Sequence, residues 1–147
     1  MTINLLKIRF MKIPEFRMVA ALMFMFMIFG TMAVSAQTLN AKIAAAIRTA
    51  NSKDLSTYFN NTLDIALPGN EGTFSKAQAE MVMRDFFSKN PPVSFTLNRE
   101  GRSKDGSEFG IGTYKCGKHE YRTSFLLKPV QGNLLIHQLR FGGDEDE

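Results

Sequence analysis

The stretch SKAQAEMVMRDFFSKNPP, residues 75–92, predicts the best-defined helix in the chain. Ser75 and Gln78 have the spacing of a capping box, in which each side chain accepts a hydrogen bond from the backbone of the other. The apolar residues that follow recur at helical spacing until the proline pair, which cannot continue a helix. These apolar positions are Ala79, Val82, Met83, Phe86 and Phe87. A helix with one such face must bury it against another element.

Downstream of this helix the sequence is typical of strands. Alternating apolar and polar residues, separated by turn residues, predict strands over residues 94–100, 108–116, 120–128 and 134–141. The short connections between them are those of hairpins. We therefore expect a four-stranded antiparallel meander.

Upstream of the capping box, two short helices and one strand are expected. Residues 39–50 carry apolar side chains at helical spacing, and residues 53–59 predict a second helix. Residues 63–67 alternate as a strand, which Pro68 and a turn over residues 69–72 bring to an end.

The predicted fold class is α+β, with three N-terminal helices packed on a strongly curved antiparallel sheet. The element order is α-α-β-α-β-β-β-β. A chain of this size has too few elements to cover both faces of the sheet, so the helices cover one. Gly110 and Gly112 lie on the same face of one strand, where they let a helix approach closely or let the strand bend sharply. Helices across the concave side of such a sheet make a cone.

The first 36 residues have the pattern of a cleaved export signal. A basic segment precedes the unbroken apolar run of residues 18–29, and small residues at 34–36 follow it. The run is shorter than the roughly 20 residues that a membrane-spanning helix needs. We expect cleavage after Ala36 and a mature protein that begins at Gln37, in the periplasm or secreted, with no contact to the membrane.

Two alternatives to this interpretation of the N-terminus remain open. Met11 is a second plausible start, because residues 11–36 alone contain every region of an export signal. The other alternative is an uncleaved N-terminal anchor. No cysteine follows the apolar run, so the protein is not expected to be a lipoprotein.

Beyond the signal, the sequence predicts one domain over residues 37–141 and a disordered acidic tail over residues 142–147. The segment after Ala36 contains 14 Lys and Arg and 13 Asp and Glu, and four of those acids are residues 144–147. The domain is therefore only mildly basic. This charge excludes the strong positive field of a nucleic-acid-binding protein.

The residues that could support chemistry are few. Cys116 is the only cysteine, so no internal disulfide is expected, and Cys116 with His119 offers too few ligands for zinc. We expect no metal and no cofactor. His137 alternates with Leu139 and is predicted to point inward, whereas Asp64 falls on the outer face of its strand. The plainer interpretation of His137 is a buried neutral histidine bonded to backbone or to a tyrosine.

Several short motifs in the chain carry a resemblance to a known family. They are residues 50–51 with 54–59, 67–69 with 71–72, 75–80, 85–87, 90–92, 103–107 and 135–140. Through these motifs the segment from Ile43 to Arg140 resembles an exported bacteroidete family known as domain of unknown function 4783, in the nuclear transport factor 2-like (cystatin-like) superfamily. The resemblance implies the cone-shaped fold and export. It implies no activity, because this superfamily hosts both enzymes and plain binding modules.

Three hypotheses for the function follow. The first is an exported, non-catalytic module that binds a small apolar or amphipathic ligand in the cone, unless the aromatic residues simply fill the core. The residues predicted to line that site are Phe59, Phe86, Phe87, Tyr114, Tyr121, Phe125 and His137. The second is an interaction module that forms a homodimer, or binds another partner, through the open face of the sheet. The third and weakest is an acid–base enzyme centred on His137, and no catalytic residue is assigned.

Overall fold

The computed structural model describes residues 37–142, which form three helices and six strands. The helices are α2 (Leu39–Arg48), α3 (Ser52–Ser56) and α4 (Lys76–Lys89). The strands are β1 (Phe59–Leu67), β2 (Asn70–Ser75), β3 (Ser94–Arg102), β4 (Glu108–Cys116), β5 (His119–Val130) and β6 (Asn133–Gly142). The fold is α+β, as predicted. The predicted export signal, and the predicted tail apart from Gly142, lie outside the described residues.

Helix α4 begins and ends where the sequence predicts. The Ser75 hydroxyl accepts a hydrogen bond from the Gln78 backbone N–H at 3.4 Å, and the Gln78 side chain accepts one from the Ser75 N–H at 3.1 Å. At the other end, Asn90 donates to the Phe86 carbonyl from its backbone at 2.8 Å and from its side chain at 3.1 Å. The two prolines follow directly, and the capping box is confirmed.

The six strands form one sheet in the order β2-β1-β6-β5-β4-β3. The predicted meander is confirmed, because β3, β4, β5 and β6 pair antiparallel with their neighbours in the chain. The pair β1 and β6 differs from the antiparallel sheet predicted, since it is parallel. The two strands are far apart in the sequence and no hairpin joins them, so the rule that a tight turn gives antiparallel strands does not apply.

Strand β2 is the element that the sequence did not reveal. The sequence places a turn over residues 69–72, whereas the chain turns at Pro68 and Gly69 and enters β2 at Asn70. Gly69 has a φ of 77°, which glycine adopts without strain. The observed order is therefore α-α-β-β-α-β-β-β-β. β2 is a short edge strand with mostly exposed residues, so it lacks the apolar alternation by which strands are recognised.

The segment before β1 also differs from the prediction. Helix α3 ends at Ser56, so Phe59 begins β1 rather than ending a helix. The pairing of β1 with β6 is irregular between Phe59 and Asp64, and this irregular part hides the strand pattern in the sequence.

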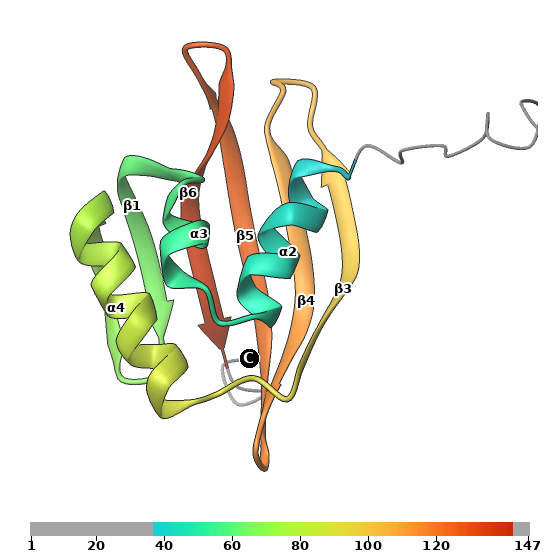
Figure 1. Ribbon diagram of the computed structural model, residues 1–147. Helices are drawn as coiled ribbons and strands as arrows, with labels where there is room; N and C mark the ends of the chain where they lie inside the picture. The colour runs from blue at the N-terminus through green and yellow to red at the C-terminus, as the bar shows by residue number, and fades with distance from the viewer. Residues whose placement is uncertain (1–36, 143–147) are drawn as a thin grey trace, which may run out of the picture. The chain divides into compact units, whose positions relative to one another are not determined.

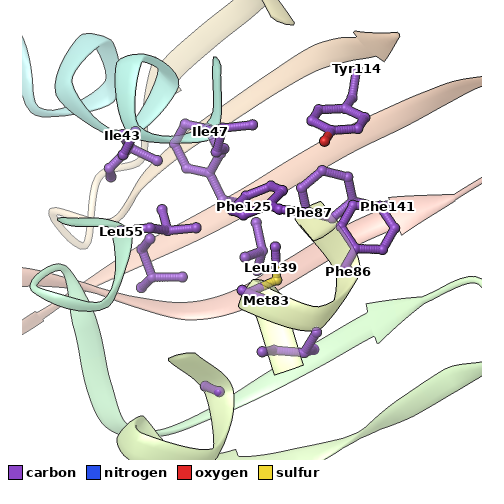
Figure 2. Close-up of a cluster of buried hydrophobic side chains, with 14 of the residues drawn as sticks. Ile43, Ile47, Leu55, Met83, Phe86, Phe87, Tyr114, Phe125, Leu139 and Phe141 are labelled. Carbon is purple, nitrogen blue, oxygen red and sulfur yellow. The ribbon is translucent and has the colours of Figure 1, made fainter. Parts of the chain in front are cut away.

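The three helices cover one face of the sheet (Figure 1). α2 packs against β3 and β4, α4 packs against β1 and β2, and α3 packs against α4. Every helix within residues 37–142 is too short or too polar to span a lipid bilayer. Apolar side chains from all three helices and from the sheet point toward one another in the space between them (Figure 2).

The sheet curves over this core. Register shifts occur between Leu97 and Arg99 in β3, and opposite Leu126 and Leu127 where β5 pairs with β6. Such bulges bend a strand and increase its twist. The helices therefore lie on one side of a bent sheet (Figure 1).

Aromatic rings from neighbouring strands lie over the two glycines of β4. A Cβ atom at Gly110 would be 2.2 Å from Cζ of Phe125, and one at Gly112 would be 2.7 Å from Cζ of Phe95. The Gly112 position would also clash with the Thr96 carbonyl oxygen, at 2.5 Å. Of the roles predicted for the glycines, close approach is correct, but aromatic rings approach rather than a helix.

Candidate functional site

The structure places most of the predicted ligand-lining aromatic residues in the core. The exposed fractions are 1% for Phe59, 6% for Phe86, 4% for Phe87, 0% for Tyr114 and 2% for Phe125. Tyr121 is half-buried at the edge of the same group. These side chains come from β1, α4, β4 and β5, so the fold brings together residues that are distant in the sequence.

Phe86 is the centre of this aromatic group. Its ring centroid lies 4.8 Å from that of Phe141, 5.8 Å from that of Tyr114, and 6.0 Å from those of Phe87 and Tyr121. These are the separations of aromatic rings in contact. The rings therefore pack on one another between helix α4 and the sheet (Figure 2).

Tyr114 joins this core to the end of α4. Its hydroxyl donates a hydrogen bond to the Asn90 carbonyl at 2.6 Å. Burial raises the pKa of Tyr114 well above its usual value, and the nearby Cys116 and Tyr121 raise it further. Burial also raises the pKa of the Cys116 thiol, which is 3% exposed. A buried, protonated thiol is a weak nucleophile, so Cys116 acts as a small apolar side chain.

His137 lies outside the aromatic group, which corrects the orientation expected from its alternation with Leu139. Ile136, fully buried, faces the core in its place. The reason is the bulge between β5 and β6: Gln138 pairs with Leu126 and Ile136 with Leu127, so His137 is the extra residue. A bulge shifts by one position the alternation of inward-facing and outward-facing side chains along the strand.

Both imidazole nitrogens of the half-buried His137 have partners. Nδ1 lies 3.0 Å from the Leu135 carbonyl oxygen, and Nε2 lies 3.2 Å from Nδ2 of Asn60. A carbonyl only accepts, so Nδ1 donates and Nε2 accepts from the Asn60 amide. This arrangement fits a neutral histidine with a structural role.

Among residues 37–142, the partners of His137 are a backbone carbonyl and a side-chain amide, not a carboxylate. Asp64 lies on the outer face of β1, as predicted, and accepts a hydrogen bond from the Thr73 hydroxyl at 2.6 Å. Within residues 37–142, no group of three His, Cys, Asp or Glu side chains is placed to hold a metal ion.

The opposite face of the sheet, which we call the open face, is not covered by any helix of residues 37–142. Residues that pair across neighbouring strands place their side chains in rows on this face. One row across β6, β5, β4 and β3 consists of Arg140, Ser124, Ile111 and Arg99. The next row consists of Gln138, Leu126, Phe109 and Gly101. Ile111, Leu126 and Phe109 form an apolar stripe, each half-buried among its neighbours.

Two hollows with charged side chains in their lining flank this stripe. The first, of about 370 Å³, is lined by Asn98, Arg99, Ile111, Gly112, Thr113, Glu120 and Arg122. The second, of about 220 Å³, is lined by Asp64, Ile65, Ala66, Glu71, Gly72, Thr73, Gln138 and Arg140. None of these residues belongs to the site predicted from the sequence. The alternation of side chains along the strands places Ile111 and Arg122 on the outer face of the sheet, and this was the one sign of the hollows in the sequence. The residues that β2 and the β3 bulge add to the hollows were not predictable.

A third hollow lies at the end of the sheet and contains one predicted site residue, Tyr121. It measures about 550 Å³. Its lining is Ala66, Leu67, Pro68, Gly69, Asn70, Glu71, Tyr121, Arg140, Phe141 and Gly142.

The chain matches a known family both in sequence and in fold. Residues 40–142 match the family model described as Domain of unknown function (DUF4783). A structure of a member from Bacteroides ovatus is 30% identical, with a TM-score of 0.67, over 72% of this chain and 96% of that one. A member from Bacteroides uniformis is 27% identical, with a TM-score of 0.69, over 74% of this chain and 100% of that one. The chain belongs to the DUF4783 family.

The fold is that of nuclear transport factor 2-like proteins. A protein of this type and of unknown function from Cytophaga hutchinsonii has a TM-score of 0.51 at 14% identity, over 70% of this chain and 84% of that one. No curated protein matches the sequence.

We predict that Tyr114→Phe lowers the free energy of unfolding at neutral pH. We also predict that this free energy falls less steeply at high pH in the variant than in the wild type. The lost hydrogen bond to Asn90 should cost about 1 kcal/mol. An unfolded tyrosine loses its proton near pH ~10, whereas the raised pKa keeps Tyr114 protonated in the folded state. The stabilisation that the Tyr114 hydroxyl gives to the folded state is therefore complete below that pH and is lost as the pH rises above it.

Urea unfolding at a series of pH values measures both effects. Tyr58→Phe, at a tyrosine that is half-buried, is the matched control. Equal dependence of unfolding free energy on pH in wild type and Tyr114→Phe would contradict the role given to Tyr114.

Proposed function

We propose that this protein is an exported, non-catalytic interaction module whose open face pairs with a second copy of the chain. The observation that supports this most directly is the apolar stripe of Phe109, Ile111 and Leu126 on a sheet face that no helix of residues 37–142 covers. Apolar side chains gathered on one surface and surrounded by polar residues are typical of protein–protein contacts.

The charges around the stripe favour a second copy over an unrelated partner. In a two-fold symmetric dimer the same surface meets itself, so it must contain both members of each complementary pair. The two hollows beside the stripe contain three basic and three acidic side chains: Arg99, Arg122, Arg140, Asp64, Glu71 and Glu120. A rotation that brings one hollow over the other places opposite charges together, which favours specific pairing.

The ligand-binding hypothesis has less support in the cone. Five of its seven residues are 6% exposed or less, and the rings around Phe86 contact one another. One observation keeps a narrower version open at the end of the sheet. There Tyr121 and Phe141 form part of the 550 Å³ hollow beside the ion pair of Arg140 and Glu71, so an apolar wall lies next to polar groups, which suits a small amphipathic molecule.

We expect sedimentation velocity to show a dimer whose dissociation constant rises about tenfold or more in Leu126→Glu, because a charge would face the apolar stripe. Met81→Glu is the matched control, since Met81 is 64% exposed on α4, on the other side of the sheet. A wild-type protein that stays monomeric at all accessible concentrations would overturn the proposal. So would equal dimerisation of the two variants.

Mass spectrometry of protein isolated from its own cell envelope tests export. The expected mass corresponds to a chain that begins at Gln37, because cleavage follows Ala36. An intact N-terminus at Met1 or Met11 would contradict cleavage. Native spectra of the same sample also test the ligand hypothesis, which requires a compound of fixed mass on the protein.

A further inference from the structure

The chain leaves the sheet beside an arginine of the open face. Gly142, the last residue of β6, pairs directly with Arg122 on β5. Gly143 and the four consecutive acids of residues 144–147 follow. The most acidic segment of the chain therefore starts one strand away from Arg122.

Arg122 and Arg99 are unusual among the arginines of residues 37–142. Neither takes part in an ion pair within that range, and both are exposed. The other four have partners there, and these pairs are Arg84 with Glu80, Arg102 with Glu108, Arg140 with Glu71, and Arg48 with the Phe95 carbonyl.

The same two arginines line the 370 Å³ hollow together. The one acid in that hollow, Glu120, has its own partner in Lys115 at 3.1 Å. The hollow therefore presents two guanidinium groups that have no carboxylate partner within residues 37–142.

The distances suit the acidic segment. Neighbouring strands lie about 4.8 Å apart, so Arg122 is one strand from Gly142. Arg99 is three strands away across the sheet and two residues along it, at about 16 Å in all. Five extended residues span up to roughly 17 Å. Residues 143–147 are long enough to pass Arg122 and to bring a carboxylate to Arg99.

We propose that residues 143–147 bind back onto the hollow at Arg99 and Arg122 of the same chain and so cover part of the open face. The attraction is between exposed charges, so it weakens as salt is added. When residues 143–147 cover part of the open face, a second copy of the chain has less of that face to bind, so these residues limit dimerisation. This last consequence rests on the proposed function, whereas the binding itself does not.

The test compares backbone amide NMR spectra of the full chain, purified from expressing cells, with those of a variant whose acids are neutralised. That variant is Asp144→Asn, Glu145→Gln, Asp146→Asn and Glu147→Gln. At low salt we expect shift differences at Arg99, Thr113 and Arg122, and we expect them to vanish at high salt. Repeating the comparison in an Arg99→Gln, Arg122→Gln background should abolish them. An Arg84→Gln background, which changes an exposed arginine on α4, should leave them unchanged.

Three outcomes would overturn the inference. The first is shift differences confined to residues 140–142, next to the neutralised segment. The second is differences that collect at the Gly117–Lys118 turn instead of at Arg99. The third is differences that grow with protein concentration, because they would place the acids of a second copy in the hollow. Sedimentation of the same samples keeps this test separate from that of the dimer, since back-binding persists in a monomer.

Discussion

The contact of Phe86 with the rings of Tyr114 and Phe141 is the interaction on which the rest of the domain depends. Phe86 projects from α4, and its ring contacts hold against β4 and β6 a helix that also packs on β1 and β2. The hydrogen bond from Tyr114 to the Asn90 carbonyl secures the end of the same helix. The ring contacts and this hydrogen bond together fix α4 on the sheet.

This packing limits the space for a ligand in the interior. Interior side chains that contact one another leave little room for a ligand, and His137 uses both nitrogens in structural hydrogen bonds. The open face has the opposite character, since its apolar stripe and its two free arginines have no partner within residues 37–142. For this reason our proposal for the function concerns the open face and not the core. Residues 143–147, when bound back on the open face, would compete with a second copy for that face, and added salt would weaken the competition.

Sequence predicted the parts of this fold that local chemistry determines. The capping box and the proline pair define α4, and hairpin turns define the meander from β3 to β6. The parallel pairing of β1 with β6 was not predictable, because it depends on contacts between segments with no turn between them. His137 was misplaced because a bulge shifts the alternation by one residue, and a bulge leaves no clear mark in the sequence. The arginine hollow depends on the same kind of irregularity in β3.

The most direct test of the account is the free energy of unfolding of Phe86→Ala, measured by urea titration. A ring packed in the core should cost about 3–5 kcal/mol when removed, and Phe86→Leu keeps a measurable transition if the alanine variant does not fold. Met81→Ala, at an exposed position of the same helix, should cost far less. A loss below about 1 kcal/mol for Phe86→Ala would contradict the account, because it would mean that the ring lines an open pocket rather than filling the core.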